Sequence, residues 1–467
     1  MSAVILEFDN TLKKSEIMMP LISSSKDEAG DDYTNTATDK AQTAVFGIQV
    51  PLIMINNTII DFDAIQYFNL KSVGKLPELV LTVLDRYELI NNIDKPSIDN
   101  EVRIQLLPKF DNAYKKIDLT FYISGIQVNG KTIRIIGTYK SPKLLSSQFK
   151  SYGNIDTYSL FKQIATETQL GFATNVALGN DTRYAYCDNK SLYELMDSEI
   201  SYANATDHIM DWWIDLWDNI NLVDIKERYT SVDSNDDMKI WVAGQVNESN
   251  AGVDVIPSYV TATITNFPGI NMSELFVKDY IINTNPGINL TSGSDKIIAV
   301  YEDLKFEHFD HLIQDGDVKN DIFTKYEYIG ENYGEYNYMI SKCMRSSFLQ
   351  KINSETITTV LQSPSLGLMR GHKVNFIRYV NDDLIESKMK AFEELDIIDR
   401  NIESNISLSE YEIDGKSANG SFKIDKTCSG QYLITGVDII YNNNVWDYKL
   451  ILARPASSKG NIIKQSK

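Results

Sequence analysis

The chain has 467 residues, which exceeds the roughly 250 to 300 residues at which a single core stops growing, so we expect two to four domains. Its 64 Asp and Glu against 45 Lys and Arg give a net charge of −19, which argues against a surface that grips nucleic acid. The N-terminus lacks a signal-peptide pattern and no apolar run reaches the roughly 20 residues of a membrane span, so we expect a cytosolic product with no stable membrane insertion.

The first part of the chain changes from polar to strand-like at Val45. Residues 22–43 are small and polar, which predicts an exposed loop or a segment ordered only by a partner. Beyond them, apolar runs alternate as in strands, and Asn129-Gly130 is the strongest hairpin signal in the sequence. We therefore expect an all-β unit of roughly five or six strands over residues 45–140, a barrel or a sandwich.

Three amphipathic helices are predicted next. Residues 157–170 show apolar side chains at helical spacing, with Asp156 or Thr157 as the N-cap and Gly171 after the end. "KSLYELMDSEISYA" (190–203) and "TDHIMDWWIDLWDNI" (206–220) show the same period. These patterns predict a small helical subdomain between β regions.

The C-terminal half returns to strand alternation after an acidic linker at 231–239. A last β block spans 356–379 and 430–455, interrupted by an acidic insertion at 381–418. Both β regions contain a strand, a further strand and a terminal hairpin, which suggests an internal duplication. That hypothesis requires the two units to share one strand order.

Candidate catalytic patterns are weak throughout. "FEHFDH" (306–311) offers Glu307, His308, Asp310 and His311 as metal ligands, but the two histidines converge only on a helix, and a solvated face is favoured. "GIQVNGKT" (125–132) spells a phosphate-loop motif, yet β-branched residues follow where a helix is needed, so a hairpin turn is favoured. We therefore predict no catalytic residue, no metal and no cofactor.

Other reactive or aromatic clusters have structural interpretations. The three cysteines lie far apart, which indicates neither a disulfide framework nor a zinc site. The pairs Asp236-Asp237 and Glu393-Glu394 are sequence neighbours whose side chains diverge, so they form no acid/base dyad. Trp212, Trp213 and Trp217 are read as core packing, with a ligand platform or a subunit contact as the alternatives.

The order of these segments resembles a known family. A β domain, "TYSLFKQIATETQLGFATN" opening a helical insertion, and a closing "CSGQYLITGVDIIYNNNVWDYKLILARP" resemble the central baseplate hub of T-even-like contractile-tailed phages. Related hubs of other contractile injection machines look similar. The likeness covers about residues 45–455; the first 44 residues and the acidic insertion have no counterpart.

The resemblance implies a mainly β fold with a helical insertion, in which two related tube-type β-barrel domains accompany a small helical subdomain. The implied division is an arm and loop (1–44), a first barrel (45–149), the helical insertion (150–229), a β linker (230–289), a second barrel (290–380 and 420–456), an acidic insertion (381–419) and a tail (457–467). Gly371 and Gly430 would be structural turns, and Trp213, Trp217, Tyr158 and Phe161 would pack subunits or subdomains.

The resemblance also implies a function. Three chains would form a ring of six barrels that joins the sixfold tail tube to the threefold central spike and lines the channel for the genome. The expected partners are two further copies, the spike, tail tube or tube-initiator proteins and wedge proteins, with non-sticky contact to DNA, in a virion assembled in the host cytoplasm. A cell-wall hydrolase of the tail tip and a glycan-binding β protein remain alternatives.

Overall fold

The structure is a computed structural model, and it describes a set of separate ranges of the sequence. They are 51–56, 58–86, 88–93, 99–106, 117–175, 181–203, 209–230, 238–242, 276–284, 296–303, 308–315, 324–331, 349, 352–361, 368–377, 379–381, 415–417, 420–424, 430–442 and 445–454. The predicted arm (1–44), the tail (457–467) and nearly all of the acidic insertion (381–419) lie outside these residues.

The first β unit spans residues 51–139. Its strands pair in the order β3-β4-β7-β6-β5-β1-β2, and the Asn129-Gly130 hairpin is confirmed, with Gly130 at φ 59° in the turn between β6 and β7. The unit contains β1 (Leu52–Ile55), β2 (Thr58–Ile60), η1 (Phe62–Ala64), β3 (Ile65–Ser72), β4 (Glu78–Leu84), α3 (Ile90–Ile93), β5 (Glu101–Leu106), β6 (Ile117–Asn129) and β7 (Thr132–Tyr139).

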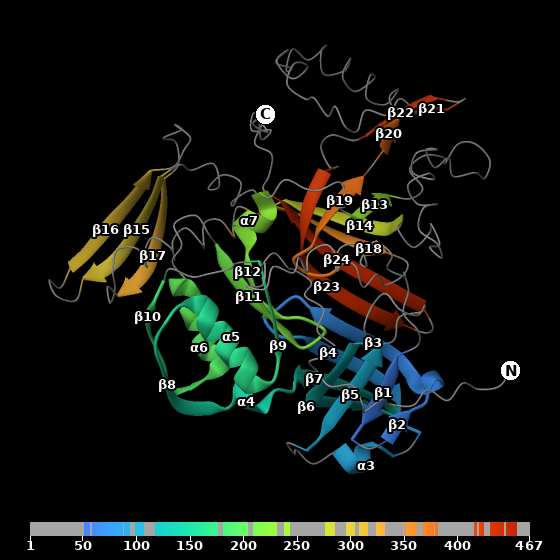
Figure 1. Ribbon diagram of the computed structural model, residues 1–467. Coiled ribbons are helices and arrows are strands. Elements are labelled where there is room, and N and C mark those ends of the chain that lie inside the picture. Colours follow the sequence, from blue (N-terminus) through green and yellow to red (C-terminus); the bar gives the residue numbers. More distant parts are fainter. Residues whose placement is uncertain are drawn as a thin grey trace, which may run out of the picture.

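The second β unit is a closed barrel of six strands. β19 pairs with β13, then β14, β18, β24 and β23 follow, and β23 pairs back to β19. The strands are β13 (Met238–Val242), β14 (Phe276–Thr284), β18 (Glu355–Leu361), β19 (Lys373–Ile377), β23 (Gly430–Asn442) and β24 (Val445–Arg454). β23 also pairs with β3, so both units belong to one 13-stranded sheet (Figure 1).

The two β units share one strand order, as the duplication hypothesis requires. β3-β4-β7-β6-β5-β1 in the first unit matches β14-β18-β24-β23-β19-β13 in the second. The matched pairs are antiparallel except at the end, where β1 runs antiparallel to β5 but β13 runs parallel to β19. The strand order therefore supports two related β units.

The duplication extends to irregularities in the strands. β6 bulges between Ile123 and Gly125, and β23 bulges between Ile434 and Gly436. At each bulge, the hydroxyl just before the glycine donates to a carbonyl of the partner strand: Ser124 Oγ to Ile136 O at 3.0 Å, and Thr435 Oγ1 to Ile451 O at 3.2 Å. β3 and β14 also bulge at matching places, Ile65/Tyr67 and Val277/Asp279. Bulges bend and twist a strand locally, so both hairpins receive the same curvature.

The insert, residues 142–230, is a mixed α/β region. It begins with α4 (Pro142–Leu145), β8 (Ser147–Ile155), α5 (Thr157–Thr168), β9 (Gly171–Thr174), β10 (Arg183–Ser191), α6 (Leu192–Glu199) and η2 (Ile200–Tyr202). The Asp156 side chain caps α5 by accepting from Ser159 N at 2.8 Å, as predicted. Ser191 and Glu194 form a capping box on α6, so the second predicted helix is also confirmed.

The prediction of a third helix over residues 206–220 is wrong. Residues 210–224 form the antiparallel strands β11 (Met210–Ile214) and β12 (Asn219–Asp224), which α7 (Ile225–Thr230) follows. β12 lies between β11 and β9, and every residue of both β11 and β12 is buried. Because both faces of this hairpin are covered, its apolar residues show no two-residue alternation, and the Trp213/Trp217 spacing imitates a helical stripe.

Strand pairing departs from the predicted division in two places. β13 and β14 come from the predicted linker (230–289) but complete the second barrel. β15 (Lys296–Asp303), β16 (His308–Asp315) and β17 (Thr324–Glu331), predicted within that barrel, form a separate three-stranded sheet, and β20 (Tyr379–Asn381), β21 (Gly415–Ser417) and β22 (Gly420–Ile424) form another. The domain boundaries as a whole stay a prediction.

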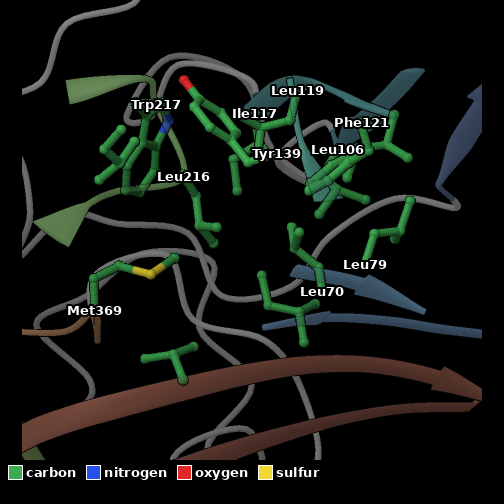
Figure 2. Packing of buried hydrophobic residues seen from close by; sticks show 14 of the residues in the cluster. Leu70, Leu79, Leu106, Ile117, Leu119, Phe121, Tyr139, Leu216, Trp217 and Met369 are labelled. Atoms are coloured by element: carbon green, nitrogen blue, oxygen red, sulfur yellow. The ribbon is translucent and has the colours of Figure 1, made fainter. Parts of the chain in front are cut away.

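One core connects the β units and the insert. Leu70 and Leu79 of the first unit, Leu216 and Trp217 of the insert, and Met369 before β19 belong to a single buried cluster. Figure 2 shows these side chains around one interior, with Tyr139 beside Trp217. The chain is thus mainly β, with a helix-bearing insert packed on two related β units. Within the described residues, no helix is long and apolar enough to cross a bilayer.

Candidate assembly site at the junction of the β units

Three segments far apart in the sequence meet at one junction. They are the β3–β4 loop (73–76), the β11–β12 hairpin of the insert, and the turn before β19 (368–372). The backbone N–H of Ile214 donates to Lys75 O at 2.8 Å, which ties the hairpin to the loop. Arg228 Nε donates to Gly371 O at 3.0 Å, which ties the insert to the turn. The junction therefore fixes the insert against both β units.

Arg370 lies at the centre of this junction. Its Nη1 donates to the carbonyl oxygens of Val73, at 2.9 Å, and Gly74, while Nη2 lies 3.7 Å from Asp211 Oδ2. The guanidinium lies 4.6 Å from the ring centroid of Trp213. The side chain is only 13 % exposed, and this burial lowers the pKa of Arg370 while Asp211 opposes the shift. One side chain of the turn thus contacts both of the other segments.

Lys75 adds a second cation to the same carboxylate. Its Nζ pairs with Asp211 Oδ1 and lies 5.4 Å from the ring centroid of Trp212. Asp211 therefore forms ion pairs with cations of both β units. Removing one member of such a mostly buried set of charges is destabilising, because it leaves the remaining charge less well compensated.

The two predicted turn glycines lie beside this region. Gly371 has φ 86° and donates its N–H to Ile434 O at 2.8 Å, joining the turn to β23. Gly430 has φ 140°, begins β23 opposite Phe376, and a Cβ there would lie 3.3 Å from Arg454 Nη1. Residues with a Cβ rarely adopt such backbone angles. Their role as structural turns remains a prediction.

The tryptophans pack inside the chain. Trp212, Trp213 and Trp217 are 0, 2 and 1 % exposed, so they form no open platform for a ligand. Trp217 belongs to the main core, whereas Trp213 packs in a smaller cluster with Leu433 and Ala453 of the second β unit. The Trp213 cluster therefore joins the insert to the barrel.

Tyr158 and Phe161 lie on α5. Phe161 is fully buried, and its ring centroid lies 6.1 Å from that of Trp212, nearly edge to face. Tyr158 is partly buried and meets Phe172 of β9 edge to face at 5.5 Å. These contacts hold α5 on the sheet of the insert. A contact with another subunit by either residue remains a prediction.

A buried carboxylate organises the β11–β12 turn. Asp215 accepts from the backbone N–H of Trp217 at 2.8 Å and of Asn219 at 2.9 Å, and from the amides of Asn219 and Asn221. Among the described residues, no Lys or Arg pairs with it. Burial raises the pKa of Asp215 to about 6, against the lowering effect of these hydrogen bonds.

The same turn contacts the first β unit. Tyr139 of β7 donates its hydroxyl to Asp218 Oδ1 at 2.5 Å, and Gly171 of β9 donates its N–H to Asp218 O at 2.9 Å. Burial, and then the neighbouring Asp218, raise the pKa of Tyr139 well above its usual value, so the phenol stays a donor. Asp218, in a left-handed conformation, thus links the β11–β12 turn to two strands, β7 and β9.

The seam between the β units has an apolar and a polar face. Where β3 pairs with β23, Leu70 and Ile439 face the core, whereas Lys71 lies opposite Asp438 on the other face. Glu78 of β4 lies opposite Lys71, and Lys449 Nζ of β24 lies 4.0 Å from Asp438 Oδ2. Four neighbouring strands therefore carry alternating charges in one row. Burial raises the pKa of Asp438, and Lys449 and Lys71 oppose that rise.

The weak catalytic candidates from the sequence do not converge. The residues of "GIQVNGKT" form the β6–β7 hairpin and precede no helix. His308 and His311 lie on strand β16, without the helix that their pairing needs, while Glu307, Asp236-Asp237 and Glu393-Glu394 lie outside the described residues. Among the described residues, no cluster of three His, Cys, Asp or Glu is placed to hold a metal.

An aromatic face on the insert was not predicted. Phe149 of β8 and Tyr184 and Tyr186 of β10 are 76, 67 and 56 % exposed on one face of the two-stranded sheet. The other face buries Ala185 and Cys187. The sequence signal of this face is the alternation in "RYAYCD" (183–188), where Tyr184 and Tyr186 are two residues apart.

Comparison with known proteins gives likenesses of fold. No protein-family model and no curated protein sequence matches the chain. The crystal structure of a tail protein from Neisseria meningitidis MC58 matches with TM-score 0.50 and 7 % identity, over 88 % of this chain and 97 % of that one. The 43 kDa tail protein of prophage MuSo2 from Shewanella oneidensis matches with TM-score 0.50 and 8 % identity, over 87 % and 98 %.

A third structure is more distant. The E. coli c3393 protein, described as a component of the type VI secretion system with similarity to T4 tail proteins gp27 and gp5, matches with TM-score 0.40 and 10 % identity, over 87 % and 77 %. That likeness is too slight to support a functional conclusion. The first two comparisons show that the chain has the fold of phage tail proteins across nearly the full length of both.

Proposed function

We propose that the chain is a structural protein of a phage-type tail, a trimeric baseplate hub without enzymatic activity. The observation that carries this proposal is the pair of β units with one strand order, joined edge to edge in one sheet. A chain that presents two equivalent units can place six of them in a ring of three copies. Such a ring matches a sixfold tube on one side and a threefold spike on the other.

A position between the tail tube and the central spike implies the remaining partners. The hub would contact tail tube or tube-initiator proteins, the central spike and the surrounding wedge proteins, in the baseplate of the virion. The insert, fixed by the junction around Arg370, would present a constant surface to the spike or the wedge. The fold likeness to two tail proteins supports a tail location, and the junction that ties the insert to both β units supports a scaffold role.

Light scattering after size exclusion, over a range of concentrations, tests the proposal. Negative-stain images of the peak are taken from the same fractions. We expect a trimer with a central hole. A chain that stays monomeric at every concentration contradicts the trimeric hub, and turnover of peptidoglycan by the purified chain would favour the tail-tip hydrolase instead. The glycan-binding alternative loses its predicted platform, because the three tryptophans are buried.

The alternating charge row bears on passage of DNA. If the polar face of the seam lines the channel, Glu78 and Asp438 balance the charges of Lys71 and Lys449, so the row offers no net positive charge to a phosphate. Asp438→Asn should therefore give the protein a salt-dependent affinity for duplex DNA. The row then carries one uncompensated lysine, which implies a log–log salt slope of about −0.9, or roughly a three- to fourfold change in affinity between 50 and 200 mM salt.

Retention of labelled duplex DNA measures this effect. The matched control is Asp188→Asn, the same charge change on exposed β10 of the insert, which should behave like the unaltered chain. Adding Lys449→Met to Asp438→Asn should reverse the gain, because Glu78 still balances Lys71. Equal retention by the Asp438 and Asp188 variants would show that Asp438 does not neutralise these lysines.

A further inference from the structure

The seam between the β units within one chain is an edge-to-edge strand pairing. Residues 437–442 of β23 run antiparallel to residues 67–72 of β3, with Asp438 opposite Lys71. On the core side, Val437, Ile439 and Leu70 are completely buried by this contact and its surroundings. The seam therefore covers two apolar strand edges that a separate unit would expose.

The matching bulges give residue-level equivalences between the units. Aligning Gly125 with Gly436 makes Ile126, Gln127 and Val128 of β6 equivalent to Val437, Asp438 and Ile439 of β23. Aligning the bulges of β14 and β3 makes Ile282 and Asn283 equivalent to Leu70 and Lys71. β6 and β14 are thus the counterparts of the two strands that form the seam.

These counterparts have no such cover. Within the described residues, 126–129 of β6 pair only with β7, and 279–284 of β14 pair only with β18. Ile126, Val128, Ile281 and Ile282 are 37 to 58 % exposed. By contrast, the residues equivalent to Ile126, Val128 and Ile282 in the seam within the chain are completely buried; they are Val437, Ile439 and Leu70. Exposed apolar strand edges invite pairing and are normally covered. Two complementary halves of a second seam are therefore present on each chain.

The two halves belong to different sides of the molecule. In the sheet order, β14 and β6 lie at either side of the β23–β24 hairpin with several strands between them (Figure 1). A contact between them joins two copies of the chain, head to tail. Contacts of this kind form a ring when the rotation closes.

We propose that β6 of one copy pairs antiparallel with β14 of the next, with Gln127 opposite Asn283, as Asp438 lies opposite Lys71 within the chain. The occupant of each exposed edge is a second copy. Ile126, Val128 and Ile282 become buried in this contact, and an amide pair replaces the ion pair on the polar face. This interface rests on the proposed trimeric hub and supplies its intersubunit contact.

A cysteine pair tests the register. Opposite residues in antiparallel strands have Cα atoms about 4.5 to 5.5 Å apart, within the range of a disulfide. The variant Gln127→Cys/Asn283→Cys, oxidised at assembly concentration, should give covalent dimers and closed trimers on a denaturing gel. The pair Gln127→Cys/Ile282→Cys, one residue out of register and on opposite faces, should not. The unaltered chain, oxidised in parallel, accounts for the native cysteines.

A charge placed on the seam tests the interface itself. Val128→Glu should raise the trimer dissociation constant by at least about thirtyfold, the size of an interface hot spot. Phe149→Glu, at a more exposed apolar residue on β8 outside the seam, should leave the trimer intact. Near-native circular dichroism of both variants confirms folding.

The outcomes separate this interface from the proposed function. A trimer that forms no Gln127–Asn283 link and resists Val128→Glu overturns the β6–β14 seam and leaves the hub in place. If Gln127→Cys/Ile282→Cys forms disulfides between copies as efficiently as Gln127→Cys/Asn283→Cys, the proposed pairing of Gln127 with Asn283 is wrong. A chain that is monomeric at all concentrations overturns both the seam and the trimeric hub.

Discussion

Arg370→Met is expected to lower the free energy of unfolding by about 3 kcal/mol, the effect of breaking a buried charge pair. The substitution keeps an apolar chain against Trp213 but removes the donors to the carbonyls of Val73 and Gly74. It also leaves Asp211 with one fewer cation. Urea unfolding followed by tryptophan fluorescence measures the change, because the tryptophans of the insert lie next to this junction.

The matched control is Arg134→Met, the same substitution on the exposed face of β7. A surface change of this kind should shift the unfolding free energy by less than about 0.5 kcal/mol. If the two variants were equally stable, Arg370 would be dispensable to the junction. A variant that unfolds in two separated steps would show instead that Arg370 couples the insert to the β units.

Asp215→Asn is expected to make the chain more stable above pH 7 and to flatten its pH dependence. The pKa of Asp215 lies near 6 in the folded chain against an ordinary 3.8, so the folded state holds this proton more tightly than the unfolded state. The resulting stability is complete below about pH 4 and is lost as the pH rises through 6, a change of about 3 kcal/mol.

The asparagine variant removes this titration while keeping the shape of the turn. Its amide oxygen can accept from the backbone N–H groups of Trp217 and Asn219, and its NH2 can donate to Asn221 Oδ1, which is buried without a hydrogen-bond partner in the structure. Thermal unfolding between pH 4 and 8 gives the comparison. The control, Asp197→Asn on exposed α6, should keep the parental profile. A uniform loss of stability at every pH would mean that the carboxylate's hydrogen bonds outweigh its burial.

Local signals in the sequence predicted local structure well. The Asn129-Gly130 turn, the Asp156 cap of α5 and the periodic residues of α6 each depend on neighbours within one or two turns of chain. The shared strand order also supports the hypothesis of two related β units, because a repeated strand pattern can be seen along the sequence. These features require no knowledge of distant contacts.

Distant contacts explain what the sequence did not reveal. The spacing of Trp213 and Trp217, four residues apart, predicts a helix over 206–220. The burial of both faces of β11 and β12, which depends on distant contacts, explains why these residues form strands instead. Arg370, Asp211 and Lys75 come from three separate segments, so no spacing marks them as partners. The β3–β23 register likewise depends on closure of the second barrel.

The pairing of β3 with β23 also sets an order of folding. Strands β3 to β7 pair among themselves within a short stretch of chain, so the first unit can form early during synthesis. Ser72 meets Val437, roughly 365 residues later, so the edge of β3 stays uncovered until the ribosome has made the chain as far as β23. Truncated or stalled chains would carry that open edge, and they are the species from which aggregation should start.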